Sequence, residues 1–354
     1  ALARNEGALP EKNKVRSCHK QYNLIQSDKT ISTEPDQYVV TVGNLQNSWT
    51  ADNRRFFYYK TSAPINFMFA LSSARYVVHK EEYKGVELRI CHQSGWSRNL
   101  ATMMQAMKDA LEYGNNQFST YPLKRLTVAE IPHYRGAATA YPGVIFSAER
   151  INFMGDFLDT NRLNYGYAIV AHEVSHQWWA NKVASVYGPG QGLLTESLAK
   201  YAEAVITEKA FGKMKLRQYR QADNRLYFSM RNLDGPELPL CTSEQPAVYY
   251  QKGGLVMYAI KEELGEAKLN RALRRLINKH AYPGPKASVD DLVRELGQEA
   301  SLIQRKRISD WLNKVIVYSM NVRIVSCRSL PTGQFRVTLR VTLAKTDQSK
   351  GKLP

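Results

Sequence analysis

The sequence predicts an α+β protein in which a β-rich N-terminal part is followed by a middle part that becomes largely helical, with β structure again at the end. Three observations indicate this order. β-branched and aromatic residues dominate residues 38–93. Apolar residues recur at helical spacing over most of the chain from Tyr167 onward, and strand-like runs return in residues 314–345.

The length of 354 residues exceeds what one small core supports, so we expect more than one domain. Residues 1–95 are expected to form a β-rich domain with an irregular lead-in. Residues 96–315 are expected to form a central domain with trailing helices. Residues 316–354 should begin a C-terminal β domain, in which "LPTGQF" supplies a turn between two strands.

The central part alternates between helical and strand patterns. Residues 98–113 predict a helix, because Met103, Met104 and Met107 recur at helical spacing, and we expect this methionine cluster to fill the core. "LKRLTVAEI" and "GVIFSAERI" predict strands with a connection between them. "LTESLAKYAEAVITEKAFG", "KGGLVMYAIKEEL" and "EAKLNRALRRLINKHA" each carry an apolar stripe typical of a packed helix.

The composition is that of a folded protein, with 44% apolar and 23% charged residues. The net charge is +17, but the basic residues are scattered and no RNA-binding consensus or zinc knuckle is present. We therefore expect a solvated surface and no nucleic-acid partner, with attraction to a membrane surface as the alternative.

Membrane-spanning segments, cysteines and the start of the chain give three further expectations. No window approaches 18 consecutive apolar residues, so no membrane-spanning helix is expected. The four cysteines make no C-x-x-C pair, which argues against cysteine-bound zinc and leaves one or two disulfides open. The chain starts without Met or a signal peptide, and we expect it to be a piece of a longer protein.

The stretch "AHEVSHQWW" carries two histidines one helical turn apart. On a helix His172 and His176 project from the same face, about 40° apart, where both can bind one metal ion. Glu173 is placed to reach a metal-activated water and to act as general base. The alternative is a helix whose histidines are ordinary core or surface residues. Trp178 and Trp179 are expected to pack this helix into the core.

A catalytic zinc ion takes three protein ligands, so a third ligand is needed. Glu196 is the candidate, because two antiparallel packed helices would bring it back over the histidine pair. Glu203 competes but lies two turns further along. We expect the glycines of "GPGQG" to be a flexible connector, since no Lys-Ser/Thr follows them as in a phosphate-binding loop. The spacing predicts one Zn²⁺ ion held by His172, His176 and Glu196.

"HEVSHQWW" followed by "LTESLAKYAE" resembles the aminopeptidase N family of gluzincin zinc metallopeptidases. The resemblance implies a thermolysin-like α/β catalytic domain over residues 96–315 and zinc-dependent, aminopeptidase-like hydrolysis of peptides. Residues 177–195 make a connector of 19 residues, one longer than is typical of the family, and Ser197 stands where the family has Gly. These departures, with "FFYYKTSAPINFMFALSSARYVV", resemble the branch fused to bacterial ABC-transporter permeases.

A second motif, "VYYQKGGLVMY", resembles the family's Y-E-K-G segment, with Gln251 in place of Glu. The resemblance implies that Tyr250 donates a hydrogen bond to the oxyanion formed during hydrolysis. Tyr249 is the neighbour that can be confused with it. On its own, Tyr250 would be read as a core aromatic residue at a helix start.

The family's third motif, G-A-M-E-N, holds the α-amine of the substrate through its glutamate. Its alignment with "AATAY" puts Ala140 at the glutamate position, so the usual amine anchor is expected to be absent. Glu149, at the end of the next strand, is the candidate substrate-binding residue, with Glu203 as a weaker one.

The resemblance implies a peptide substrate, cleaved with either exopeptidase or endopeptidase preference. Two alternatives stay open: a domain that binds peptides with little or no cleavage, and a structural domain in which zinc only joins two helices. The permease-fused branch implies membrane-embedded segments of the same polypeptide and an ATPase subunit as partners. It also implies a bacterial inner-membrane location, with this domain facing the periplasm or the exterior.

Overall fold

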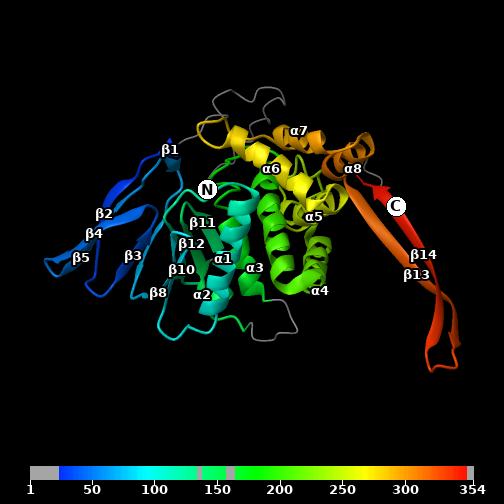
Figure 1. Cartoon of the computed structure of the whole chain (residues 1–354), viewed down its shortest axis with the longest axis horizontal. Coiled ribbons are helices and arrows are strands. Elements are labelled where there is room, and N and C mark those ends of the chain that lie inside the picture. Colours follow the sequence, from blue (N-terminus) through cyan, green and yellow to red (C-terminus); the bar gives the residue numbers. More distant parts are fainter. Residues whose placement is uncertain (1–23, 134–137, 157–163, 349–354) are drawn as a thin grey trace, which may run out of the picture.

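The computed structural model describes residues 24–133, 138–156 and 164–348 of the chain. The predicted α+β class is confirmed: a β-rich N-terminal region leads into a central sheet, a helical second half follows, and a strand pair ends the described chain (Figure 1). The helices of the second half lie on one side of the central sheet and the N-terminal strands on the other (Figure 1).

Short antiparallel strands form the N-terminal region. They are β1 (Leu24–Ile25), β2 (Asp28–Thr33), β3 (Tyr38–Thr41), β4 (Asn44–Ala51), β5 (Arg54–Lys60), β6 (Ile65–Asn66) and β7 (Leu71–Ala74). They pair as β2-β5-β4, β3-β7 and β1-β6. In strand β5, Phe57 and Tyr59 are fully or almost fully buried, and the Tyr59 hydroxyl donates to the Val39 carbonyl oxygen at 2.6 Å.

The central sheet has the order β11-β12-β10-β9-β8. Its strands are β8 (Val77–Tyr83), β9 (Val86–His92), β10 (Arg125–Ile131), β11 (Ala138–Tyr141) and β12 (Val144–Ala148). Strands β9, β10 and β12 run parallel, and β8 and β11 close the two edges as antiparallel strands. The sheet therefore takes strands from both sides of residue 95, where the sequence suggests a domain boundary.

Helices begin at residue 100 and make up most of the chain from residue 165 onward. They are α1 (Leu100–Gln117), α2 (Glu149–Asn152), α3 (Tyr165–Ser175), α4 (Leu198–Met230), α5 (Gly253–Leu264), α6 (Glu266–His280), α7 (Val289–Glu299) and α8 (Leu302–Asn313), with two π-helical segments, η2 (Leu193–Ser197) and η3 (Ala247–Lys252). Helix α1 starts two residues later and ends four residues later than predicted, and its Met103, Met104 and Met107 are buried core residues, as expected.

The two faces of the central sheet have different neighbours. Leu88, Leu126 and Val128 on one face join the core formed with α1 and α3. Ala129 and Phe146 belong to a second cluster, against the strands of the N-terminal region. Because side chains alternate along each strand, near-continuous apolar runs such as "LTVA" in β10 supply both faces at once.

Strands β13 (Ile316–Ser329) and β14 (Phe335–Asp347) pair with each other and form a ribbon that extends away from the helices (Figure 1). Met320 lies opposite Leu343 and Val322 opposite Val341, and all four side chains are exposed. Among the described residues, no helix is long and apolar enough to cross a membrane.

Candidate metal centre

The three predicted metal ligands converge on one point. His172 and His176 follow one another on the turn that ends α3, and their Nε2 atoms are 3.1 Å apart. The Oε2 atom of Glu196, in η2, lies 3.3 Å from Nε2 of His172 and 3.2 Å from Nε2 of His176. Donor atoms of a tetrahedral zinc ion, each about 2.0–2.1 Å from the metal, lie roughly 3.3 Å from one another. The three donors therefore fit a zinc ion and leave its fourth position for water or substrate.

The other ring nitrogen of each histidine has a partner that orients the imidazole. Nδ1 of His172 lies 3.1 Å from Oε2 of Glu203, and Nδ1 of His176 lies 2.9 Å from the carbonyl oxygen of Trp179. Both partners accept hydrogen bonds, so in the neutral form of each imidazole the proton lies on Nδ1 and Nε2 is left to bind a metal. Glu203 is thus placed to orient His172 rather than to compete with Glu196 for the metal.

The charges around the three donors favour a cation. Burial by itself lowers the pKa of His172, but hydrogen bonds with Glu196 and Glu203 outweigh it and raise this pKa to about 10. Burial raises the pKa of Glu196, but the two histidines outweigh it and hold this pKa well below its usual range. The carboxylates thus stabilise a positive charge at the histidines, and a divalent metal ion bound there would supply that charge in place of the protons.

Glu173 faces the same space with its carboxylate largely removed from water. The residue is 7% exposed, and burial raises its pKa, an effect that His176 and His172 oppose. A carboxylate whose pKa is raised accepts a proton more readily than an exposed one. The helix therefore places the carboxylate that the sequence predicts as general base beside the two histidines that it predicts as metal ligands.

Tyr250, in η3, lies beside the histidines. Its ring centre is 6.2 Å from that of His172 and 5.0 Å from that of Tyr249. Burial raises the pKa of the Tyr250 phenol, and the nearby Glu196 carboxylate raises it further. The phenol therefore keeps its proton at neutral pH and can donate it in a hydrogen bond.

The two residues of the centre that lie outside the H-E-x-x-H motif are both in π-helical segments: Glu196 in η2 and Tyr250 in η3. A π-helix is wider than an α-helix, is rare, and is found frequently at functional sites. The sequence analysis predicted ordinary helices here. The glycines that flank the two segments, in "GQG" and "KGG", are the only signal in the sequence that this backbone is unusual.

A largely buried lysine, which no sequence motif indicates, supports the centre. Nζ of Lys200 lies 2.9 Å from Oε1 of Glu203, 3.2 Å from Oδ2 of Asp223 and 2.9 Å from the Tyr219 hydroxyl. Burial lowers the pKa of Lys200, but the neighbouring carboxylates, Glu203 first, raise it well above its usual value. The ammonium therefore stays charged and holds the Glu203 carboxylate against His172.

The expectation that "GPGQG" is a flexible connector is wrong, because two of its glycines are packed against other segments. Gly190 has φ +80°, and a Cβ atom there would lie 2.0 Å from the carbonyl oxygen of Cys241. A Cβ atom on Gly192 would lie 2.5 Å from Cγ of Tyr249. These glycines permit close approach of the loop to η3 and to the segment before it.

The edge strand β11 lies next to the end of the metal-binding helix. The Gln177 side chain joins the two: its Oε1 accepts from the Gly143 amide at 2.9 Å, and its Nε2 donates to the Tyr141 carbonyl oxygen at 3.0 Å. Ala140, at the position expected for the amine-binding glutamate, is buried in this strand and pairs with Ile145.

Glu149 lies at the start of α2, half buried, and its Oε1 accepts from the His133 amide at 3.3 Å. The nearby Glu130 is buried, and its pKa is raised by burial and, more weakly, by Glu149. The contacts described for Glu149 do not join it to the three metal ligands, and its role in substrate binding stays a prediction.

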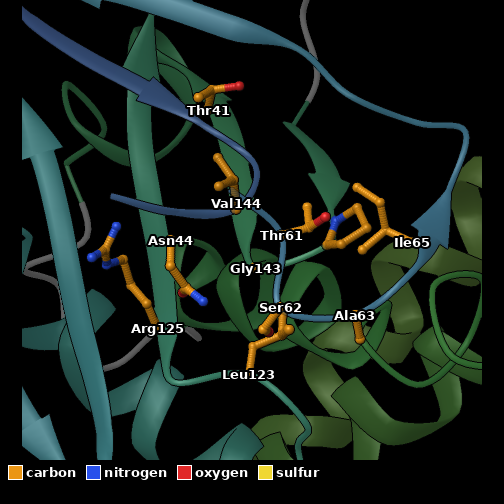
Figure 2. A pocket seen from close by; sticks show the side chains of 12 residues that line it. Thr41, Asn44, Thr61, Ser62, Ala63, Ile65, Leu123, Arg125, Gly143 and Val144 are labelled. Carbon is orange, nitrogen blue, oxygen red and sulfur yellow. The ribbon is translucent and has the colours of Figure 1, made fainter. Parts of the chain in front are cut away.

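A small cavity lies away from the metal ligands, between residues 61–65 of the N-terminal region and strands β10 and β12 (Figure 2). Its walls include Thr61, Arg125 and Val144, and its volume is about 20 Å³. That space holds about one water molecule. The cavity is too small for a peptide.

Trp178 and Trp179 are almost completely buried, as predicted, and both pack against Phe118. Cys91, Cys241 and Cys327 carry free thiols in the part of the chain that the structure describes, whereas Cys18 lies outside the described residues. The disulfides that the sequence left open are therefore not formed among these three cysteines.

An H-E-x-x-H helix with a glutamate ligand on the next helix, beside the edge strand of a mixed sheet, defines the class of zinc metallopeptidases. Residues 102–314 match the model of the Peptidase family M1 domain, which is more than half of the chain. The chain belongs to this family, which implies a zinc cofactor.

Known proteins with similar sequences are aminopeptidases. Aminopeptidase M1-B of Oryza sativa subsp. japonica is 23% identical over 246 residues, which are 64% of this chain and 27% of that protein. Aminopeptidase 2 of Candida albicans is 21% identical over 341 residues, 90% of this chain and 35% of that protein. Endoplasmic reticulum aminopeptidase 2 of Homo sapiens is 26% identical over 205 residues, 53% of this chain and 20% of that protein.

The fold resembles that of solved structures in the same family. An M1 zinc metallopeptidase from Deinococcus radiodurans superposes with a TM-score of 0.64 and 15% sequence identity, over 83% of this chain and 65% of that one. The chain spans about a third or less of the length of the three aminopeptidases.

Proposed function

We propose that this protein hydrolyses peptide bonds with one bound zinc ion, in the manner of an aminopeptidase. One observation carries the proposal: the donors of His172, His176 and Glu196 lie 3.1–3.3 Å from one another, with a buried carboxylate and a phenol beside them. A zinc ion bound there would lower the pKa of a water molecule and polarise the scissile carbonyl.

The residues of the chain supply the other steps. Glu173 takes the proton of the attacking water and passes it to the nitrogen of the leaving amine as the peptide bond breaks. Tyr250 donates a hydrogen bond to the oxygen of the scissile carbonyl as negative charge develops on it. Glu203 and the Trp179 carbonyl oxygen keep both imidazoles in the orientation that the reaction needs.

The edge strand β11 offers a place for the substrate backbone. It pairs with β12 on one side only among the described strands, so an extended peptide can add to its other side through main-chain hydrogen bonds. Ala140 in this strand has only a methyl side chain at the position where a carboxylate would bind the α-amine of the substrate. We propose Glu149 as the substitute amine partner, on the ground that it directly follows β12, the strand that pairs with β11.

The test is digestion of a peptide library by the zinc-loaded protein, with free and with acetylated N-termini. We expect cleavage that requires zinc and that Glu173→Gln abolishes while zinc stays bound. Loss of cleavage on acetylation, reproduced by Glu149→Gln with free peptides, would support recognition of the α-amine. Equal cleavage of both peptide sets would rule out a dominant amine anchor, and a Glu173→Gln variant as fast as the wild type would rule out the proposed base.

Ala140 also favours a second candidate function: a domain that captures peptides with little or no cleavage, as part of an ABC-transporter permease. Tight peptide binding by the zinc-loaded protein without products would favour this function over hydrolysis. Retained transport in a Glu173→Gln, Tyr250→Phe variant, with loss of folding in His172→Ala, would indicate a structural zinc ion instead.

We further propose that the domain is attached to membrane-embedded permease segments and works with an ATPase subunit on the outer side of a bacterial inner membrane. The resemblance of residues 56–78 to the permease-fused branch supports this. Exposed Phe67, Met68 and Phe69 in that stretch also offer an apolar contact surface. The test is protease treatment of intact spheroplasts that carry the native protein: cleavage in this domain from outside supports the proposal, and protection until lysis contradicts it.

A further inference from the structure

The two π-helical segments that carry Glu196 and Tyr250 are held together through one residue, Tyr249. Gly192 immediately precedes η2 and Ser197 ends it, so these two residues flank Glu196. Both contact Tyr249, the residue before Tyr250 in η3. The side chain of Tyr249 meets Gly192, and its backbone meets Ser197.

The contact at Gly192 depends on the missing side chain. A Cβ atom there would lie 2.5 Å from Cγ, 2.6 Å from Cδ1 and 2.8 Å from Cβ of Tyr249. The stem of the Tyr249 side chain therefore rests directly on the backbone that leads into η2. Tyr249 cannot shift toward the loop, because the backbone is already in contact with it.

The contact at Ser197 is a hydrogen bond from a buried hydroxyl group. Ser197 is completely buried, and its hydroxyl donates to the carbonyl oxygen of Tyr249 at 2.6 Å. Gly253, just after η3, leaves room for this hydroxyl, since a Cβ atom on Gly253 would lie 2.0 Å from Oγ of Ser197. The two segments are far apart in the sequence, yet the Ser197 hydroxyl at the end of η2 fits only because the residue after η3 is glycine.

We propose that Ser197 is a positioning residue that sets the distance of the Tyr250 phenol from the metal ligands; this rests on the proposed peptidase function. Glu196 and Ser197 are neighbours in η2, and Tyr249 and Tyr250 are neighbours in η3. The hydrogen bond between Ser197 and Tyr249 therefore links the third metal ligand to the oxyanion donor, because each of the two bonded residues is one peptide bond away from Glu196 or Tyr250.

Such a link matters because an oxyanion donor acts only within a narrow range of distance, about 2.7–3.1 Å. A displacement of about 1 Å can cost up to roughly a hundred-fold in rate. Ser197→Ala removes the hydrogen bond and leaves the Tyr249 carbonyl oxygen without that donor. We expect kcat to fall about ten-fold, with KM and zinc affinity unchanged, because the residue acts only through Tyr250.

The decisive experiment is a double-mutant cycle with Tyr250→Phe, measured as kcat on one peptide at saturating zinc. Ser197→Ala should cost about ten-fold when Tyr250 is present and nothing measurable in the Tyr250→Phe background. Equal cost in both backgrounds would overturn the proposal, because Ser197 would then act independently of Tyr250. Absence of zinc-dependent cleavage by the wild type would instead overturn the peptidase function.

A second measurement does not use activity. Hydrogen exchange of the η3 amides in both the zinc-free and the zinc-loaded protein should be faster in Ser197→Ala, whereas exchange in α6 should not change. Ser147→Ala is the control, because Ser147 is also completely buried and holds one hydrogen bond, from Asn152, but lies in β12. Unchanged exchange in η3, or the same change in both variants, would overturn the positioning role.

A third experiment distinguishes the steric fit between Gly253 and Ser197 from the hydrogen bond that Ser197 donates. Gly253→Ala alone should destabilise the protein, because its methyl group would clash with the Ser197 hydroxyl. Ser197→Gly makes room for that methyl group, so the double variant should recover the stability of Ser197→Gly but not the lost kcat. Recovery of kcat in the double variant would show that the hydroxyl is not needed for positioning.

Discussion

The carboxylate of Glu203 bridges a charged lysine and a metal-binding histidine: its Oε1 lies 2.9 Å from Nζ of Lys200, and its Oε2 lies 3.1 Å from Nδ1 of His172. Glu203 is 1% exposed, and burial raises its pKa, but Lys200 and His172 outweigh burial and keep the pKa below its usual value. The carboxylate is therefore ionised at neutral pH and fixes both the tautomer and the orientation of His172.

This bridge predicts that Glu203→Gln weakens zinc binding although Glu203 does not contact the metal. Partners of this kind are typically worth about 10- to 100-fold in metal affinity. The measurement is competition for zinc with a chromophoric chelator. Glu208→Gln is the matched control on the same helix, since Glu208 pairs with Lys261 at 2.8 Å instead of with a histidine. An equal loss of affinity in both variants would contradict the role of Glu203.

The position of Tyr250 predicts that Tyr250→Phe lowers kcat while KM and zinc content stay unchanged. Removal of one oxyanion donor costs about 10²- to 10³-fold in kcat in enzymes of known mechanism. Tyr249→Phe is the control, because Tyr249 contributes its ring and its carbonyl oxygen to the contacts with Gly192 and Ser197. The measurement is steady-state kinetics on one peptide. A larger fall in kcat for Tyr249→Phe than for Tyr250→Phe would contradict the assignment of Tyr250 as the oxyanion donor.

The packing of Gly114 predicts opposite results for two Gly→Ala changes in helices. A Cβ atom on Gly114, in α1, would lie 2.2 Å from Cη2 of Trp178, and overpacking of this kind costs about 1–3 kcal/mol in the free energy of unfolding. Gly297, in α7, has open space around it, so Gly297→Ala should gain about 0.5–1 kcal/mol from helix propensity. Urea unfolding of both variants is the measurement, and a neutral Gly114→Ala would contradict the close packing of Trp178.

The raised pKa of His172 predicts a pH dependence of stability for the zinc-free protein. This pKa is about 10 in the folded protein and about 6.5 in the unfolded chain, where no partner is present. The stability that protonated His172 contributes is therefore complete below pH 6.5 and is lost as the pH rises to about 10. The midpoint of urea unfolding should fall across this window without zinc and should fall much less with zinc, which displaces the proton. Parallel curves for both forms would contradict the prediction.

Much of the fold could be predicted because the relevant signals are local. The helical spacing of Met103, Met104 and Met107 predicts α1 and its buried face, and the β-branched and aromatic residues that dominate residues 38–93 predict β structure. The sequence did not reveal that β11 is a strand, because this segment has only four residues and, among the described strands, pairs with β12 alone. It also did not reveal that β8 and β9 join the central sheet, because strand pairing depends on residues distant in sequence.

By itself the sequence determined which residues are candidates for the centre: His172, Glu173 and His176 share one helical motif, and the spacing of Glu196 predicts it as the third ligand. Only the tertiary structure decided how these groups are held. The bridge from Lys200 through Glu203 to His172, and the contacts of Tyr249 with Gly192 and Ser197, join different helices and loops. Helical periodicity relates residues within one element, whereas the distance between two elements is set by the packing of their side chains.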